Sequence, residues 1–262
     1  MSWAKPNSLL DYLGAEHTNE LVGVHRYGRH LQMLAHIDGF LRAPVPHLEL
    51  PAKKHAIAQL YMFVNYSLYA VAANLLRLHV SEAMGCERRA IDATFAAYEM
   101  ILDPESVEEY EKGEARFLFI KNRIQKARNK DENLYPLAKE LLKTHDHCSA
   151  YGAHADMKSM QMRMKHVKMQ VVENKHNVFF LYFEEPQSEA DANLFYVDTF
   201  LNFLNMAKVF APFVQEHAKG FDFKAWSERL ASLDLDCRKV WAGVAKKVDE
   251  EYEQLLQQEQ QQ

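Results

Sequence analysis

The side chains best suited to chemistry gather in one short stretch near the middle of the chain. Imidazoles and carboxylates at high density can transfer protons or hold a metal ion, and a thiolate beside an imidazole can act as a nucleophile. No complete catalytic motif is present, so the stretch predicts the position of a site and not a reaction. Its members are His145, Asp146, His147, Cys148, Tyr151, His154 and Asp156.

In an enzymatic interpretation, His154 is the general acid or base of this stretch. Asp156, His147 or Tyr151 would then orient its imidazole ring. A nucleophilic Cys148 is disfavoured, because neither a sharp strand-to-helix turn nor a glycine-lined oxyanion loop surrounds it. We expect Cys148 to be a small, half-buried packing residue.

Metal binding by these histidines is disfavoured by their spacing. On a helix, His145 and His147 point about 200° apart, and His147 and His154 lie about 10 Å apart along one face. Two helical ligands of one ion need positions three or four residues apart. The dipeptide His145-Asp146 resembles the metal-chelating pair of the all-helical HD phosphohydrolases, which implies a metal-dependent hydrolase as an alternative. Since the partner motifs of that family cannot be assigned, we expect no metal and no cofactor.

Positive charge is concentrated in the same part of the chain. Residues 116–175 contain thirteen Lys and Arg against six Asp and Glu, in a protein whose formal net charge is -5. Such a segment can face RNA, another anion or an acidic protein partner. The competing interpretation is an ordinary solvated helix face. The side chains expected to contact a ligand are Arg123, Lys126, Arg128, Arg163 and Lys165.

The composition is that of a soluble protein in a reducing compartment. Hydrophobic residues make up 48% of the 262, and the three cysteines are odd in number and far apart, which favours a cytoplasmic location. Residues 1–14 show no signal-peptide pattern. The uncharged stretch Leu60–Leu76 is shorter than the roughly 20 apolar residues of a membrane span. We therefore expect it to be a buried central helix, with no membrane association.

Apolar residues recur with a helical period over most of the chain, and prolines, glycines and capping residues mark the helix ends. Ser188 with Asp191 is typical of a capping box, and we expect Pro212 to kink or end the helix that begins there. Helices are predicted at about Thr18–Arg42, 52–79, Glu87–Leu102, a short segment after Asp103, Glu114–Asn129, Leu134–His145, 189–212 and Phe223–Leu256.

One segment changes its period from helix to strand. Val167, Met169 and Val171 alternate with polar residues, and residues 178–183 have the aromatic and β-branched bias of a strand. With residues 173–177 as the turn, the sequence predicts a β-hairpin near residues 166–184. Because two strands alone are marginal in water, the hairpin must pack on helices or on a second copy of the chain.

The expected architecture is an all-α multi-helix bundle with this one inserted hairpin. Residues 1–256 should form a single domain, and the glutamine-rich residues 257–262 a disordered tail. Apolar residues of the last helix, from Trp226 to Val248, are spaced close to a heptad seam. We expect this helix to pair with the preceding one, completing the core or mediating self-association as a homodimer.

The layout resembles that of the HEPN-like helical proteins of bacteria. The matching stretch is Cys148-Ser149-Ala150-Tyr151-Gly152-Ala153-His154, preceded by helix and followed by a basic helix and a strand. The resemblance covers about residues 59–210 and implies a helical dimer. Active members look like metal-independent RNases that use an arginine and a histidine separated by four to six intervening residues. Here the three corresponding positions hold His147, Cys148 and Ser149, which puts nuclease activity in doubt.

These patterns together predict a cytoplasmic binding or interaction protein of HEPN-like type that engages RNA or another anion. One alternative is a metal-dependent hydrolase or an RNase built on the stretch His145–Asp156. Another is a purely structural dimer whose basic segment docks an acidic partner. The prediction leans away from an enzyme.

Overall fold

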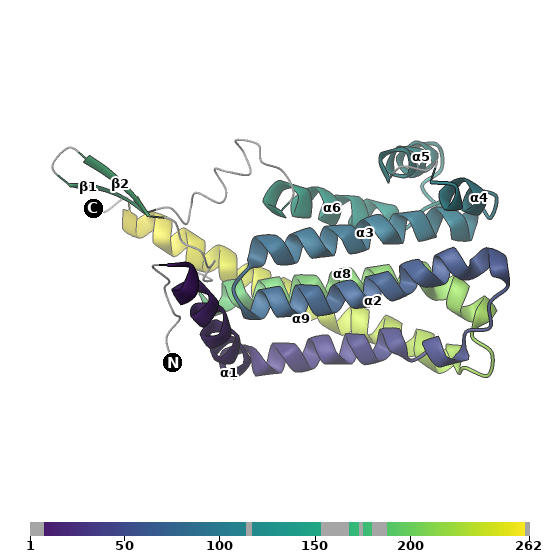
Figure 1. Cartoon of the computed structure of the whole chain (residues 1–262), viewed down its shortest axis with the longest axis horizontal. Coiled ribbons are helices and arrows are strands. Elements are labelled where there is room, and N and C mark those ends of the chain that lie inside the picture. The colour runs from purple at the N-terminus through teal and green to yellow at the C-terminus, as the bar shows by residue number, and fades with distance from the viewer. Residues whose placement is uncertain (1–7, 114–116, 153–167, 173–174, 180–187, 260–262) are drawn as a thin grey trace.

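The computed structural model describes residues 8–113, 117–152, 168–172, 175–179 and 188–259. Within this part of the chain, five long helices form the body of the protein, and Figure 1 shows them running side by side. The main packed pairs are α2 with α3, α8 with α9, α1 with α2, and α8 with both α3 and α1. The five helices are α1 (Leu9–Arg42), α2 (His55–Leu76), α3 (Val80–Leu102), α8 (Glu189–His217) and α9 (Phe223–Glu259).

Three shorter helices lie against one side of α3. α6 (Ala138–Gly152) packs along α3, while α4 (Ser106–Glu111) and α5 (Phe117–Lys130) lie near the C-terminal end of α3 (Figure 1). Each of these helices overlaps a helix predicted from the sequence, and the predicted all-α multi-helix class is confirmed.

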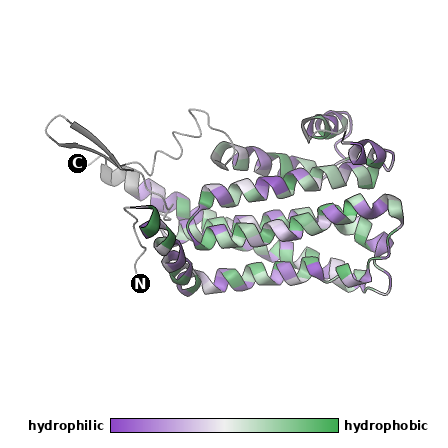
Figure 2. Cartoon of the chain, in the orientation of Figure 1, coloured by the Kyte–Doolittle hydropathy of each residue, from purple (hydrophilic) through white to green (hydrophobic). Residues whose placement is uncertain are grey.

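Large apolar side chains from α2, α3 and α8 form the centre of the bundle. Tyr61, Phe95, Phe203, Phe210 and Phe213 are all fully buried. Figure 2 shows hydrophobic and hydrophilic residues alternating along the long helices, as expected of amphipathic helices around one core. Burial of a Phe side chain stabilises a fold by about 1.5–3 kcal/mol, so this group contributes much of the packing energy.

Two serines begin helices through their hydroxyl groups. The Oγ of Ser188 accepts a hydrogen bond from the backbone N–H of Asp191 at 3.0 Å, which confirms the predicted cap of α8. Near the N-terminus, the Oγ of Ser8 accepts a hydrogen bond from the backbone N–H of Asp11 at 3.2 Å. This cap begins α1 at Leu9, whereas the sequence predicted a start near Thr18.

α1 is divided by a kink at Tyr27, whose φ of -112° and ψ of 20° are not helical. We call the part before the kink, Leu9–Arg26, the N-terminal arm. A Cβ atom at Gly23 would overlap the backbone carbonyl oxygen of Leu76. The arm therefore approaches the C-terminal end of α2 as closely as backbone atoms allow.

Two helices continue past the positions where the sequence suggested an end. Pro212, expected to kink or end its helix, lies inside α8, which continues to His217. Burial of Phe210 and Phe213 on either side holds the helix together, and this packing outweighs the one backbone hydrogen bond that a proline removes. α9 extends to Glu259, so the predicted tail from residue 257 begins inside a helix.

Two short strands, β1 (Lys168–Val172) and β2 (Lys175–Phe179), lie beyond one end of the bundle in Figure 1. They pair antiparallel, with Met169 opposite Val178. Lys175, His176 and Asn177 belong to β2 and not to the predicted turn. Residues 153–167 and 180–187 on either side lie outside the described residues, so a hairpin packed into the domain near residues 166–184 stays a prediction.

α2 contains the uncharged stretch Leu60–Leu76. In the described part of the chain it is the one helix long and apolar enough to cross a membrane by length and composition, and half of its most apolar window is buried inside the protein. Core helices of soluble proteins commonly have this character.

Candidate functional site

The described part of the histidine-containing stretch lies on α6. His145 and Cys148 are buried there, while Asp146 and His147 are exposed. Tyr151 belongs to the last turn of α6. The remaining predicted site residues lie outside the described residues: His154, Asp156, Arg163 and Lys165.

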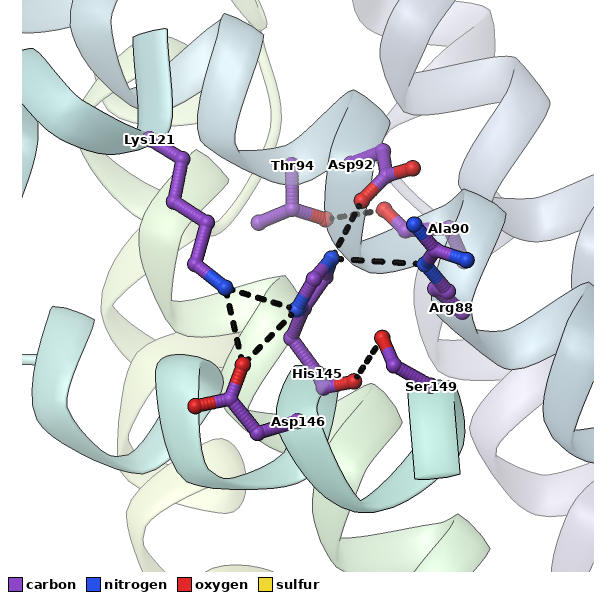
Figure 3. A network of polar contacts seen from close by, with 8 residues as sticks. All are labelled: Arg88, Ala90, Asp92, Thr94, Lys121, His145, Asp146 and Ser149. Atoms are coloured by element: carbon purple, nitrogen blue, oxygen red, sulfur yellow. Dashed lines mark hydrogen bonds and ion pairs between the residues drawn. The ribbon is translucent and has the colours of Figure 1, made fainter. Parts of the chain in front are cut away.

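His145 is the centre of a network of charged side chains that point toward its ring (Figure 3). Its Nε2 lies 3.3 Å from Asp92 Oδ1 and 3.4 Å from Arg88 Nε, both on α3. Its Nδ1 lies 3.2 Å from Asp146 Oδ1 and 3.0 Å from Lys121 Nζ of α5. Lys121 also donates to Asp146 at 2.8 Å. The network therefore joins α3, α5 and α6 through one imidazole.

Each ring nitrogen of His145 faces one donor and one acceptor. When Nδ1 carries the proton, it donates to Asp146 and Nε2 accepts from Arg88. When Nε2 carries the proton, Nδ1 accepts from Lys121. Asp92 Oδ1 lies close to Nε2, but no hydrogen bond joins these two atoms. The tautomer of the ring thus decides which neighbours it contacts by hydrogen bonds.

The network affects Asp146 as well. Desolvation alone would raise the pKa of its carboxyl group, but hydrogen bonds from Lys121 and His145 outweigh that effect, and the pKa lies below its usual value. Asp146 therefore stays ionised beside the imidazole.

A cavity of about 410 Å³ lies next to this network, between α2, α3, α4 and α5. Asp92 belongs to both, since it faces His145 and also lines the cavity. Arg89 supplies the second charged group of the lining. The other lining side chains are apolar or aromatic: Leu60, Phe63, Ala93, Ala96, Tyr110 and Ile120.

Arg89 differs from the other basic residues near the cavity. Its Nη2 donates to the Sγ of Cys86 at 3.0 Å, and its side chain is exposed. Among the described residues, no carboxylate lies within ion-pair distance of this guanidinium. By contrast, Lys121 is paired with Asp146 at 2.8 Å. Arg89 thus presents a positive charge at an apolar hollow.

The predicted ligand contacts on α5 have different surroundings. Arg123 Nε lies 2.6 Å from Glu99 Oε1 and its Nη1 lies 2.8 Å from Glu109 Oε2, so two carboxylates hold its guanidinium. A ligand would have to displace them, which favours a structural role for Arg123. Lys126 is exposed and Arg128 is half-buried on the same helix.

A second buried polar group lies between α3, α6 and α8. Glu87 is buried, and the side-chain amide of Asn202 donates to its Oε1. The hydroxyl of Thr144 donates to Asn202 Oδ1 at 3.1 Å. Burial raises the pKa of Glu87 to about 7, and the nearby charge of Asp198 adds to this effect.

Cys148 lies beside this group and is fully enclosed. Burial raises the pKa of its thiol, and the charge of Glu87 adds to the rise. The predicted packing role is confirmed by its burial, which is more complete than the half-burial expected. A thiol of this kind is a poor nucleophile, because the thiolate is the reactive form.

Among the residues the structure describes, no group of three or more His, Cys, Asp and Glu side chains could hold a metal ion. The two members of the dipeptide His145-Asp146 have Lys121 and Asp92 as their partners.

The sequence pointed to the stretch that contains His145 but did not reveal the residues that contact its ring. Arg88 and Asp92 are four residues apart on α3, a spacing that puts both on one helix face. Lys121 approaches from α5, far from either in sequence. The spacing of Arg88 and Asp92 is visible in the sequence. The packing of α3 on α6, which brings this pair to His145, is not.

The chain matches no protein-family model, and no curated protein or solved structure is significantly similar to it.

Proposed function

We propose that the protein binds a small amphipathic anion, with the apolar part of the ligand in the cavity and its negative group at Arg89. The observation that carries this proposal is the guanidinium of Arg89, which lines an apolar hollow and has no carboxylate partner among the described residues. A cavity of about 410 Å³ falls within the range of small-molecule sites, which are mostly apolar with a few placed polar groups.

The charges around the cavity support an anion over a cation. Arg88, Arg89 and Lys121 stand against Asp92 and Asp146, and Asp146 is already neutralised by Lys121. Asp92, the one carboxylate in the lining, has the imidazole of His145 at 3.3 Å. The charge left for a ligand is that of Arg89.

Binding and not catalysis is the activity these surroundings favour. The one reactive group near the cavity, His145, is enclosed by four charged side chains, and the cysteines of the described residues are buried. A ligand in the cavity would meet apolar surface and Arg89. This agrees with the prediction from sequence of a binding protein that engages an anion.

Calorimetric titration with medium-chain alkyl carboxylates tests the proposal. We expect dodecanoate to bind more tightly than dodecanol, because only the carboxylate can accept hydrogen bonds from Arg89. Arg89→Gln should weaken dodecanoate binding about tenfold, since a hydrogen bond to a charged group contributes about 1.5–3 kcal/mol. Ala93→Leu should prevent binding by filling the hollow.

Arg229→Gln is the matched control. Arg229 is an exposed arginine that lines a different hollow of about 500 Å³, between α1 and α9. The Arg229→Gln variant should bind dodecanoate as the unmodified protein does. Equal affinity for carboxylate and alcohol, or equal binding by Arg89→Gln and Arg229→Gln, would refute the assignment of the negative group to Arg89.

RNA is a second candidate anion, favoured by the exposed Lys126 on α5 and by the HEPN-like layout. Binding of a single-stranded RNA should weaken steeply with salt, because phosphate contacts release counterions. A Lys126→Gln/Arg128→Gln variant should reduce the salt slope by about 2 if both side chains contact phosphate. An unchanged slope would exclude α5 as the contact surface.

A further inference from the structure

The N-terminal arm of α1 carries an apolar face that points into solvent. Leu10, Leu13, Leu21 and Val24 are 79%, 58%, 53% and 47% exposed, and the exposed His17 lies between them. With about 100° per helical residue, these five side chains fall within an arc of about 80°. Scattered exposed leucines are ordinary, but a continuous stripe along one helix face indicates a contact surface.

The opposite face of the arm fixes its position on the bundle. Ala15, Asn19 and Val22 are buried against the junction of α2 and α3. Glu16 pairs with the imidazole of His79, and its other oxygen lies 3.1 Å from Arg77 Nη1. Desolvation would raise the pKa of Glu16, but its bonds to His79 lower it below its usual value. The arm lies at one end of the bundle (Figure 1), and these contacts anchor it there while its leucines stay exposed.

The spacing of the exposed face has two-fold symmetry. Leu13 and Leu21 each lie four residues from His17, and Leu10 and Val24 each lie seven residues from it. We propose that this face binds the same face of a second copy of the chain, with the two arms antiparallel. Leu13 then meets Leu21 of the other copy, Leu10 meets Val24, and the two His17 side chains face each other at the two-fold axis. This surface is independent of the proposed ligand site.

A symmetric spacing fits a second copy of the chain, because an isologous interface requires that when residue i contacts residue j, j also contacts i. The separations of three and four residues also suit packing between the ridges of two helices.

The charges of the arm agree with a second copy and disagree with a membrane. Between Ser8 and Val24 the arm carries Asp11, Glu16 and Glu20 and no Lys or Arg, so an anionic lipid surface would repel it. Antiparallel pairing brings Asp11 of one copy toward His25 of the other, on the same flank of the stripe. There the imidazole can donate a hydrogen bond to the carboxylate, whereas parallel pairing would place Asp11 against Asp11.

The size of the face sets the strength of the dimer. Fourteen residues separate Leu10 from Val24, a length of about 21 Å along the helix. One helix face of this length is smaller than the roughly 800 Å² per partner of a standard interface. We therefore expect a dimer that dissociates on dilution.

Cysteine cross-linking of the full chain tests both the surface and the orientation. His17→Cys should form a disulfide-linked dimer alone, because position 17 lies on the axis. Leu13→Cys should cross-link to Leu21→Cys when the two variants are mixed. Leu13→Cys should not cross-link to itself, since the two copies of residue 13 lie about 12 Å apart along the arms and a disulfide needs Cα atoms within about 7 Å. The cysteines of the described residues are buried and give little background.

Sedimentation velocity over a range of concentrations supplies the second measurement. Leu13→Glu/Leu21→Glu should be monomeric where the unmodified protein is dimeric, a weakening of more than tenfold. Leu235→Glu is the matched control, because Leu235 is 57% exposed on α9 and should leave the dimer intact. Self-linking of Leu13→Cys would show a parallel pair and overturn the proposal. A monomer at every concentration, or binding of the arm to phosphatidylcholine vesicles instead, would also overturn it.

Discussion

Glu87 is a carboxyl group placed where its charge is poorly tolerated. It is buried between α3 and α8 and has the amide of Asn202 as a partner, with Thr199 also contacting it. Its pKa of about 7 exceeds the usual glutamate value of about 4.3, because burial penalises the ionised form. The folded protein therefore holds a proton that the unfolded chain has already released between these two pH values.

This difference predicts a loss of stability with rising pH. The unfolded chain binds fewer protons than the folded one between about pH 4 and pH 7, so the free energy of unfolding falls across that window and stays low above it. The full effect is about 3–4 kcal/mol. Denaturation at about pH 5 and at about pH 8 measures it, and Glu87→Gln should remove most of the difference.

Asp198 can also contribute to the fall in the free energy of unfolding with rising pH. Burial raises its pKa too, so part of the pH dependence should survive in Glu87→Gln. Asp198→Asn therefore serves as the comparison. If Glu87→Gln lost as much stability between the two pH values as the unmodified protein, Glu87 would have to be ionised in the fold.

The three cysteines predict a slow reaction with thiol reagents. All are buried, and burial raises the pKa of Cys237 to about 12 and that of Cys148 further still. Modification by a disulfide reagent should run more than about tenfold slower than for a free thiol, because the reagent attacks the thiolate. All three should react once denaturant unfolds the chain. One thiol reacting at the free rate in the native protein would contradict this burial.

At the scale of single residues, the sequence predicted the role of a side chain better than the residues that it contacts. The packing role of Cys148 followed from the absence of a catalytic turn around it, and its burial confirms that role. Arg123 was expected to face a ligand, because sequence alone does not place Glu99 and Glu109 around its guanidinium. Those contacts depend on how α3, α4 and α5 pack.

At the scale of the helix, Gly23 is the closest contact between the arm and α2. Gly23→Ala should destabilise the fold by about 1–3 kcal/mol, because its Cβ would overlap the carbonyl oxygen of Leu76. Alanine in a free helix position acts in the opposite direction. Gly39→Ala, also in α1 but with nothing near its Cβ position, should stabilise by about 0.5–1 kcal/mol. Thermal unfolding of the pair measures the contrast, and equal shifts would mean that the arm does not touch α2.

The helices themselves were largely predictable, and the errors have physical causes. Ser188 marks a helix start by local chemistry, which the sequence displays directly. The start of α1 was missed because the arm's leucines face solvent, so its apolar pattern does not extend the core-facing stripe. Of the two effects expected of Pro212, a helix end is not observed, because burial of Phe210 and Phe213 stabilises α8 on both sides of it.

For the whole molecule, ligand binding should appear as thermal stabilisation. A ligand at about 100 times its dissociation constant adds about 2.7 kcal/mol to the free energy of unfolding. For a chain of this size that raises Tm by roughly 5–10 °C. Dodecanoate should produce this shift in the unmodified protein and in Arg229→Gln, but not in Ala93→Leu. A shift of the same size in Ala93→Leu would place the ligand elsewhere.

The bundle class was predictable from the sequence, whereas the cavity was not. Its lining comes from α2, α3, α4 and α5, and the sequence pattern of no single one of these helices predicts a cavity. Leu60 and Ala96 have the spacing of ordinary core residues. Only their assembly leaves space unfilled beside Arg89.

Two contacts anchor the N-terminal arm of α1 to the bundle, and their separation in sequence constrains the length of the arm. Glu16 and Gly23 lie seven residues apart, close to two helical turns, so both face the junction of α2 and α3. Insertion or deletion of one residue between them would turn one anchor away by about 100°. Insertions and deletions should therefore be tolerated far better in the connection after Ala43 than between Glu16 and Gly23. The two helical turns between these anchors have to keep their length.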